Sequence, residues 1–430
     1  MSRDEIRVGI LGFGIVGGGT YEVLCRNAES IRQRVGVPVR VVRIADIDWS
    51  RDRGLDVPEE LQTTDAAEVY AADDIDIVVE TIGGVSPASD FVLAAIANGK
   101  SVVTSNKEMM AKRGAEILDA AAAAGVDVEF EGAVGGTIPI IRALKESLEA
   151  NRIEEVTGIL NGTTNYILTR MTEEGSDYAE VLADAQALGY AEADPTNDVE
   201  GIDAKYKIAI LSAIAFGHRI SYDEIHNEGI TKISAADIDY ATEMGYAIKL
   251  LATARRDTDR LDVRVHPALV PKSHPLAQVN GVFNAVWVVG DACDQVMLYG
   301  RGAGALPTGS AVAGDILDCA RNILSGSRSR VPCTCRGVAH LMPMEDVRSR
   351  NYVRMRVKDR PGVLGSIATI FGQEGVSIES VVQRGGSKNG LTEIVWIMHE
   401  GPERELHSAL GAIGQLGIVD EVCSVLRVID

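Results

Sequence analysis

The chain has 430 residues, of which 46% are hydrophobic and 24% are charged, and this length suits two or three domains of about 150 residues each. Its formal net charge of −20 argues against nucleic acid or an anionic membrane as the main partner, because both attract positive protein surfaces. Six cysteines are too few for a disulfide scaffold, and neither a secretory signal nor a bilayer-spanning run is apparent. We therefore expect a soluble, cytoplasmic protein of several domains.

A glycine-rich motif follows the first apolar run of the chain. Residues 6–11 have the composition of a strand, and Gly-Phe-Gly-Ile-Val-Gly at 12–17 leads into one helical pattern. Here Gly12 permits a tight turn, Gly14 lets backbone approach a pyrophosphate, and Gly17 lets helix and sheet pack closely. The helix N-terminus then faces the phosphate charge. The alternative is a purely structural strand-to-helix turn.

Strands and helices alternate through the first third of the chain. Further strands are predicted at residues 37–46, 75–81, 101–105 and 126–131, with helices at 89–98 and 109–124. This alternation predicts an α/β fold with a parallel sheet covered on both faces. Ligands of such sheets bind at the carboxyl ends of strands. The residues that follow the strands include Gly12, Asp46, Thr81, Asn106, Lys107 and Glu131.

Asp46 stands at the end of the second predicted strand. An acid at this place binds the adenosine ribose hydroxyls in NAD sites. Arg51 and Arg53 follow closely and would instead suit a 2′-phosphate. The alternative is an exposed turn in which Asp46 and Asp48 lie beside solvated arginines. We expect NAD(P), with a slight preference for NAD.

Polar residues stand at two predicted helix starts in the middle of the chain. A strand at 153–160 ends in Asn-Gly-Thr-Thr-Asn-Tyr at 161–166. These residues are common helix caps, but their amides and hydroxyls would also suit a polar substrate. Asn197 or Asp198 is expected to cap a helix that runs through Ile214.

An acid and a base share one face of that second helix. Asp203 and Lys207 are four residues apart, and the same face continues through Ile210 and Ile214. Because this apolar stripe must pack inward, a charged pair at its head is costly unless it is paired or functional. The alternative is a surface ion pair. Lys205 falls off the stripe and is expected to be solvated.

Together these motifs resemble the homoserine dehydrogenases. The segment Asp-Pro-x-x-Asp-Val-x-Gly-x-Asp-x-x-x-Lys at 194–207 is similar to the signature of that family. Supporting matches are 12–17, Ser-Asn-Lys at 105–107, Asn-Gly-Thr-Thr-Asn-Tyr-Ile at 161–167, Gly-Ala-Gly at 302–304 and Asp315. The resemblance implies NAD(P)-dependent hydride transfer at C4 of aspartate β-semialdehyde, giving homoserine for threonine, methionine and isoleucine synthesis. The alternatives are another amino-acid semialdehyde reductase and a catalytically silent nucleotide sensor.

The same resemblance implies roles for five residues. Lys207 resembles the proton donor to the developing alkoxide, and Lys107 the lysine that touches substrate and nicotinamide. Glu192 resembles the residue that binds the polar end of the substrate, with Asp198 as a further substrate-binding residue and Asp203 lining the pocket. A free lysine has a pKa of about 10.4, so action as a base at neutral pH needs a lower pKa. Burial and a second ammonium nearby would both lower it.

The resemblance also implies cofactor and cation contacts. The cofactor residues are Gly12, Phe13, Gly14, Ile15, Val16, Gly17, Asp46, Thr81, Ser105, Lys107 and Gly304. The loop Glu-Gly-Ala-Val-Gly-Gly-Thr-Ile at 131–138 resembles a loop that binds a monovalent cation, such as sodium, largely through backbone carbonyls. Its ligands would be Glu131, Val134, Gly136 and Ile138. The alternative is an ordinary glycine-rich turn.

The last 80 residues form a separate pattern. Strands at 352–358, 376–383, 391–399 and 422–428 alternate with two helices in the order βαββαβ, and Asp-Arg-Pro-Gly-Val-Leu stands at 359–364. This ferredoxin-like order and turn resemble an ACT domain, which implies an amino-acid effector, with threonine favoured. The alternative is a module that serves oligomerisation alone. A homodimer or homotetramer is expected.

The domain organisation follows from these patterns. We expect a Rossmann-type doubly wound NAD(P)-binding domain at 1–137, an α+β catalytic and dimerisation domain at 138–330, a linker at 331–350 and the ACT domain at 351–430. A helix at about 310–324 is expected to return to the first domain. Cys333 and Cys335 lie in the linker, and we expect free thiols there because metal-binding partners at suitable spacing are missing from the segment.

Overall fold

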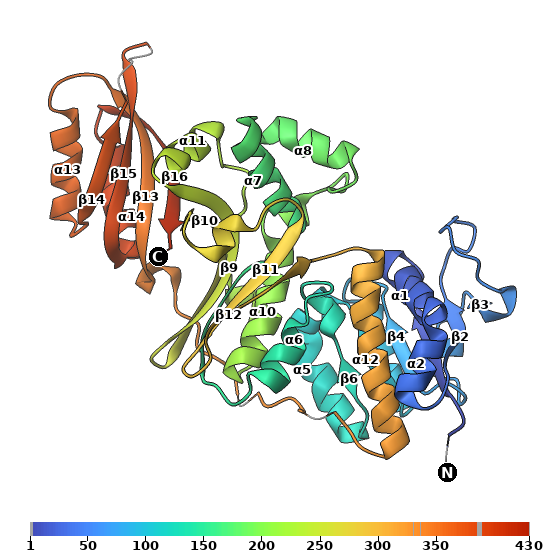
Figure 1. Ribbon diagram of the computed structural model, residues 1–430. Coiled ribbons are helices and arrows are strands. Elements are labelled where there is room, and N and C mark those ends of the chain that lie inside the picture. Colours follow the sequence, from blue (N-terminus) through green and yellow to red (C-terminus); the bar gives the residue numbers. More distant parts are fainter. Residues whose placement is uncertain (1–2, 330, 336, 385–388, 430) are drawn as a thin grey trace. The chain divides into compact units, whose positions relative to one another are not determined.

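A computed structural model describes the chain apart from residues 1–2, 330, 336, 385–388 and 430 (Figure 1). The chain divides into two compact units. Unit 1 comprises Met1–Val156, Tyr206–Glu224 and Asn284–Ala339, and unit 2 comprises Thr157–Lys205, Ile225–Phe283 and His340–Asp430. Within the described residues, no helix has the length and apolar character needed to cross a membrane.

Unit 1 is built on a six-stranded parallel sheet. Its strands are β1 (Ile6–Leu11), β2 (Val39–Ala45), β3 (Gln62–Thr63), β4 (Ile77–Glu80), β5 (Ser101–Thr104) and β6 (Val128–Glu129). The order is β3-β2-β1-β4-β5-β6, with every pairing parallel. Strands β4 and β5 are buried throughout, which explains why their central residues are apolar. The order reverses between β1 and β4, and this is the switch point at which doubly wound sheets bind ligands. The predicted α/β fold is confirmed.

Helices cover this sheet. They are α1 (Ile15–Arg26), α2 (Ala28–Val35), α3 (Ala67–Tyr70), α4 (Ala88–Ala97), α5 (Lys107–Ala124) and α12 (Ala305–Ser325). Figure 1 shows α12, in orange, beside α1 and α2, in blue. The helices α1 and α12 approach so closely that a Cβ on Gly19 would lie 2.1 Å from the carbonyl oxygen of Ala305. Val312 and Ile316 of α12 share one core with Ile6 of β1.

The middle of the chain supplies the following elements. They are α6 (Ile140–Arg142), a π-helical turn (Ala143–Ser147), β7 (Ile153–Ile159), α7 (Gly162–Glu174), α8 (Tyr178–Ala187), α9 (Thr196–Val199), α10 (Ile202–Phe216), β8 (His226–Asn227), α11 (Ala235–Glu243), β9 (Tyr246–Asp257), β10 (Arg260–Pro271), β11 (Phe283–Gly290) and β12 (Asp294–Arg301). In unit 2, β10 pairs antiparallel with β9 and parallel with β8.

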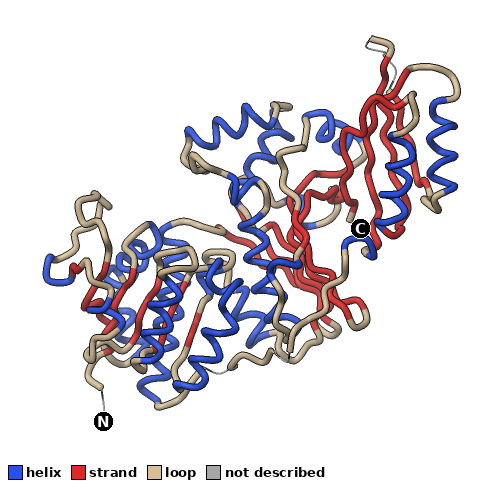
Figure 2. The backbone as a smooth tube through the Cα atoms, turned by 180° about the vertical axis from the view of Figure 1, so that it is seen from behind, coloured by secondary structure: helices blue, strands red, loops and turns tan. Residues whose placement is uncertain are grey.

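The C-terminal module consists of β13 (Arg348–Lys358), α13 (Val363–Gln373), β14 (Ile378–Gln383), β15 (Leu391–Pro402), α14 (Glu403–Gly414) and β16 (Val419–Val428). The predicted βαββαβ order is confirmed. Figure 2 shows its strands in red and its two helices in blue, seen from behind. Alternate residues of β13 and β15 form one core with both helices, and Phe371 meets Trp396 edge to face at 5.4 Å. Strand β16 pairs with β10, so the sheet of the module continues into the preceding part of unit 2.

Three predicted helix boundaries are wrong. The helix after the glycine motif is interrupted at Asn27, which separates α1 from α2. Helix α5 begins at Lys107 because the Asn106 side chain caps it, accepting a 3.0 Å hydrogen bond from the backbone of Met109. Asp198 does not cap the long helix: it lies within α9, and Gly201, at a φ of +78°, separates α9 from α10.

Candidate active site

The glycine motif forms the turn between β1 and α1. Gly12 has a φ of +89°, and a Cβ there would lie 3.0 Å from the backbone of Thr81. A Cβ on Gly17 would lie 2.1 Å from the carbonyl oxygen of Gly12. A Cβ on Gly14 would meet no atom within 4 Å, and no side chain caps α1 at this residue. The turn therefore has one open backbone position at a helix N-terminus, which suits a phosphate group.

Strand ends on either side support this turn. The Thr81 hydroxyl donates a 2.7 Å hydrogen bond to the carbonyl oxygen of Gly12. The buried carboxylate of Glu80 accepts hydrogen bonds from the backbone of Ile82 and from the Thr104 hydroxyl at the end of β5. Burial raises the pKa of Glu80. The sequence reasoning missed Glu80, although an acid that ends an apolar buried strand is a usable signal.

Asp46 lies against the same turn. Its carboxylate accepts a 2.6 Å hydrogen bond from the backbone of Phe13 and a 2.9 Å hydrogen bond from the Arg53 guanidinium. Arg53 in turn donates a 2.6 Å hydrogen bond to the carbonyl oxygen of Phe13 and lies over the Trp49 ring. Both charged side chains are half-buried. Asp46 and Arg53 therefore form a fixed ion pair beside the glycine turn, where the adenosine ribose is predicted to bind.

The predicted cation loop is buried. The Glu131 carboxylate accepts 2.8 Å hydrogen bonds from the backbone of Ile141 and of Arg142, and burial raises its pKa to about 6. The backbone N–H of Glu131 donates a 2.8 Å hydrogen bond to Asp315 on α12. Gly136 has a φ of +56°, and a Cβ there would lie 2.7 Å from the backbone of Gly302. The loop is thus tightly packed, and the carbonyl oxygens of Glu131 and Ile138 accept backbone hydrogen bonds from Val134 and Ile140. Backbone carbonyl oxygens are the hard donors that alkali cations favour.

Among the described residues, no group of three or more His, Cys, Asp or Glu side chains could hold a metal ion. A cation in this loop would depend on its backbone oxygens. The Glu131 carboxylate is directed at the start of α6 through its two hydrogen bonds. The Glu131 carboxylate would therefore act on a cation in the loop through its charge and not as a direct ligand.

Asn161 joins two of the predicted substrate-site acids in unit 2. Its side-chain oxygen accepts a 2.8 Å hydrogen bond from the backbone of Thr164, which caps α7. Its side-chain nitrogen donates hydrogen bonds of 2.7 Å to Asp198 and 2.9 Å to Asp203. The capping interpretation is therefore confirmed, and the same amide also belongs to a polar cluster with the two acids. The sequence reasoning left Asn161 out of the site, although capping uses only the oxygen of an asparagine amide.

Helix α10 carries the acid and the base that the sequence singled out. Asp203 is 4% exposed, and Lys207, one turn later, is 7% exposed. This burial excludes the surface ion pair. Lys205 is only 8% exposed, so its predicted solvation is wrong. The reason is that this stretch of α10 is buried on every side, since Ala204 and Tyr206, the neighbours of Lys205, are buried too.

The remaining predicted site residues lie as follows. Glu192 is exposed in the loop between α8 and α9, where its carbonyl oxygen accepts a 3.0 Å hydrogen bond from Gln186. Lys107 is the half-buried first residue of α5, directly after β5. Gly304 is the N-cap of α12 with a φ of +123°. Ser105 and Val16 are half-buried, and Ile15 is exposed at the first residue of α1.

A glycine turn at the switch point of a doubly wound sheet, with a polar strand end on each side, is typical of the dinucleotide-binding domain of NAD(P)-dependent oxidoreductases. The chain matches the family "Homoserine dehydrogenase, NAD binding domain" over residues 12–131, "Homoserine dehydrogenase" over 139–317 and "ACT domain" over 351–418. The chain belongs to the homoserine dehydrogenase family.

Relatives support this membership along the whole chain. A homoserine dehydrogenase of Neisseria gonorrhoeae is 45% identical over 98% of both chains. The crystal structure of a homoserine dehydrogenase from Thiobacillus denitrificans has a TM-score of 0.94 and 45% identity, and covers 99% of this chain and 98% of that chain. A hyperthermophilic archaeal homoserine dehydrogenase in complex with NADPH has a TM-score of 0.63 and 27% identity, covering 73% of this chain and 97% of that chain.

The predicted activity is confirmed by these findings. The enzyme catalyses NAD(P)-dependent hydride transfer between aspartate β-semialdehyde and homoserine, a step in the synthesis of threonine, methionine and isoleucine. The C-terminal module is an ACT domain, as predicted.

Proposed function

We propose that Lys207 exchanges the proton that accompanies hydride transfer, in a substrate pocket organised by Asp198 and Asp203. The observation that carries this proposal is the burial of Lys207 one turn after Asp203, which Asn161 ties to Asp198. A buried lysine on a helix whose first turn is held by hydrogen bonds has a restricted position, which proton transfer requires and a solvated lysine would lack.

The proton balance is simple. The bound nicotinamide supplies or accepts the hydride at C4 of the substrate. In the direction of homoserine, the Lys207 ammonium gives a proton to the developing alkoxide oxygen, and in the other direction neutral Lys207 takes the hydroxyl proton. Lys107 contacts the substrate and the nicotinamide. Glu192 binds the amino end of the substrate, where a carboxylate complements the positive charge.

For the cofactor, we propose NAD(P) bound along residues 12–17 and at Thr81, Ser105, Lys107 and Gly304. Asp46 suits ribose hydroxyls and Arg53 suits a 2′-phosphate, and the archaeal relative was solved with NADPH. Because Asp46 and Arg53 are paired, a substitution of Arg53 tests the preference for NADP over NAD. Arg53→Gln should raise the KM for NADP more than the KM for NAD if the guanidinium holds a 2′-phosphate. Equal effects on both would assign Arg53 to the support of Phe13 alone.

We further propose that the carbonyl oxygens of Glu131, Val134, Gly136 and Ile138 bind a monovalent cation such as sodium. When bound, such an ion supplies positive charge to the buried loop and stiffens its carbonyls. Activity in sodium, potassium and choline buffers of equal ionic strength tests this proposal. Equal activity in all three would contradict it.

At the ACT domain we propose an amino-acid effector, with threonine favoured because it is an end product of the pathway. Calorimetric titration with threonine, isoleucine and methionine, together with activity at each concentration, tests this. No heat and no change in activity with any of them would leave oligomerisation as the role of the module. We also propose that the enzyme is a homodimer or homotetramer in the cytoplasm. Its domain boundaries are proposed to lie at residues 137, 330 and 350.

The assignment of Lys207 is tested by following nicotinamide absorbance with homoserine and with aspartate semialdehyde, each with NAD and NADP. Lys207→Ala should lose most turnover and keep its affinity for the nucleotide. A close analogue of the semialdehyde serves as control for substrate choice. A near-normal kcat in the variant would overturn the role of Lys207.

A further inference from the structure

Ten residues of unit 2 connect the ACT domain to Asp198, Asp203 and the Asn161 that binds both, here called the acid cluster. Residues 228–237, here called the strap, lead from the end of β8 into α11. At the first end, the Arg427 guanidinium of β16 is hydrogen bonded to the Glu228 carboxylate. Arg427 also pairs with both carboxylate oxygens of Glu403, at 3.2 and 3.1 Å. The ion pairs and the hydrogen bond from His226 outweigh burial and hold the pKa of Glu228 at about 2.

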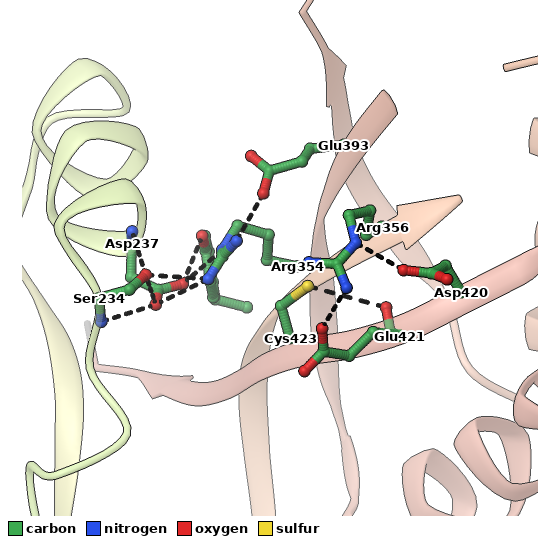
Figure 3. Close-up of polar contacts among 9 residues, drawn as sticks. Ser234, Asp237, Arg354, Arg356, Glu393, Asp420, Glu421 and Cys423 are labelled. Atoms are coloured by element: carbon green, nitrogen blue, oxygen red, sulfur yellow. Dashed lines mark hydrogen bonds and ion pairs between the residues drawn. The ribbon is translucent and has the colours of Figure 1, made fainter. Parts of the chain in front are cut away.

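At the other end the strap is held by β13 (Figure 3). The Arg354 guanidinium donates hydrogen bonds of 2.8 and 3.1 Å to the two carboxylate oxygens of Asp237 and one of 2.9 Å to the Ser234 hydroxyl. Ser234 and Asp237 form the capping box that starts α11. Tyr352 donates a further 3.2 Å hydrogen bond to Asp237, whose side chain is fully buried. The N-terminus of α11 is therefore fixed by the ACT domain.

The middle of the strap packs on the turn between α9 and α10. A Cβ on Gly229 would lie 2.2 Å from the carbonyl oxygen of Val199, so only glycine fits there. The backbone of Ile230 donates a 2.8 Å hydrogen bond to the same oxygen. The hydroxyl of Thr231 donates a 3.1 Å hydrogen bond to the carboxylate of Glu200. The strap thus contacts the turn by close packing, a backbone hydrogen bond and a side-chain hydrogen bond.

This turn connects the two acids that Asn161 holds. Asp198 is in α9 and Asp203 is in the first turn of α10. A movement of residues 199–201 that shifts α9 relative to α10 therefore changes the separation of the two carboxylates, or breaks one of their hydrogen bonds to Asn161. The geometry of the acid cluster therefore depends on the contacts between the strap and residues 199–201.

We propose that Arg354 and Arg427 of the ACT domain are positioning residues for the substrate site, acting through the strap on the turn at 199–201. The inference rests on the proposed function of Asp198 and Asp203. It goes beyond that function because it places two residues of the ACT domain in the machinery that holds the substrate, whether or not an effector is bound.

Figure 3 also supplies the matched control. Arg356 lies two residues from Arg354 on the same strand, but its partners are Asp420 and Glu421 of the ACT domain itself. The side chain of Arg356 is 42% exposed and that of Arg354 is 7% exposed. An arginine-to-lysine change at each position keeps the charge and removes the fork-shaped pairing.

The experiment compares Glu228→Gln and Arg354→Lys with the controls Arg356→Lys and Glu421→Gln. We expect the first two to raise the KM for homoserine about 3- to 30-fold, with kcat and the KM for the nucleotide within about twofold of wild type, since the nucleotide turn lies in unit 1. The controls should match wild type. Hydrogen exchange followed by mass spectrometry should show faster exchange both in the strap and in residues 196–203.

Two reference variants make every result decisive. Asp198→Asn tests the proposed function itself, and an unchanged KM for homoserine there would overturn that function. If Asp198→Asn raises KM while Glu228→Gln and Arg354→Lys do not, the strap inference alone is wrong. Thr231→Val removes the hydrogen bond to Glu200 without touching either arginine, so its KM for homoserine decides the question if Glu228→Gln or Arg354→Lys fails to fold.

Discussion

Asn161 and Asp203 are joined by a 2.9 Å hydrogen bond from the side-chain amide to the carboxylate, in a place where both side chains are buried. The same amide nitrogen binds Asp198 at 2.7 Å. One neutral group therefore holds two negative charges close together. Without it, each carboxylate would lose one hydrogen bond, and burying two neighbouring acids would cost more free energy.

Asn161→Ala should lower kcat/KM for homoserine by about ten- to hundredfold, because a hydrogen bond to a buried charge contributes about 1.5–3 kcal/mol. Steady-state kinetics at saturating nucleotide measure this effect. The control is Asn197→Ala, an exposed asparagine in α9 that should have wild-type kinetics. Wild-type kinetics for Asn161→Ala as well would remove the acid cluster from the substrate site.

Gly14→Ala should separate nucleotide binding from folding. Its Cβ would meet no atom within 4 Å, so the thermal midpoint should stay at the wild-type value. The methyl group would, however, occupy the backbone position that a pyrophosphate approaches, and the KM for NAD(P) should rise about tenfold or more.

Gly17→Ala is the matched comparison for that variant. Its Cβ would lie 2.1 Å from the carbonyl oxygen of Gly12, so it should lower the thermal midpoint as well as the affinity. A normal KM in Gly14→Ala would show that the pyrophosphate does not lie against this turn.

Glu131 should make stability depend on pH in a defined window. Burial raises its pKa from the ordinary 4.5 to about 6, so the folded state binds the proton more tightly than the unfolded state. The stabilisation is present in full below pH 4.5 and is lost as pH rises through about 6. A shift of this size corresponds to about 2 kcal/mol.

Denaturant unfolding of wild type and Glu131→Gln, in choline buffers between pH 4.5 and 7.5, measures this. The difference in unfolding free energy between the two proteins should change by about 2 kcal/mol across the window, with wild type losing stability as pH rises. Burial raises the pKa of Asp315 and the Glu131 charge raises it further, so the same comparison in an Asp315→Asn background separates the titration of Asp315 from that of Glu131. A pH-independent difference would contradict the assignment.

Cys333 should be the most reactive thiol of the linker. Its hydrogen bond from Cys335 lowers its pKa to about 6, while the thiol of Cys335 has a raised pKa. Cys333 is exposed, and Cys319, whose pKa burial raises, is fully buried. Brief alkylation at pH 7 followed by peptide mass spectrometry should label Cys333 first and leave Cys319 unlabelled, because thiolates are the reactive species.

Cys335→Ser is the test of the cause. It removes the thiol donor that stabilises the Cys333 thiolate, so the alkylation rate of Cys333 at pH 7 should fall. An unchanged rate would assign the reactivity to another neighbour, such as the Arg219 guanidinium.

The fold was largely predictable from the sequence because its signals are local. Apolar runs such as Ile6–Leu11 became buried parallel strands, and the glycine spacing marked the turn before α1. The break at Asn27 was not predictable, since the helical pattern continues across it. The predicted solvation of Lys205 failed for a related reason. The periodicity of the sequence identifies the apolar face of α10, but the residues on the other faces around Lys205 are buried as well.

The candidate site was predictable where motifs are contiguous and not where distant residues meet. The spacing from Asp198 to Lys207 was visible in the sequence. The hydrogen bonds from Asn161 were not, because Asp198 lies 37 positions and Asp203 lies 42 positions further along the chain. The strap was invisible because its partners, Arg354 and Arg427, lie more than 100 positions away. Such long-range pairs depend on the tertiary fold and leave no periodic signal.

If Lys207, buried in α10, carries the proton, a comparison of Lys207→Met with Lys205→Met shows it most directly. Both replace a buried cation on the same helix by an apolar side chain of similar length. With homoserine and saturating NAD(P), kcat of Lys207→Met should fall about 10²- to 10⁴-fold with unchanged nucleotide affinity, while Lys205→Met should stay within about tenfold of wild type. A kcat of Lys207→Met close to wild type, or an equal loss in both variants, would contradict the account.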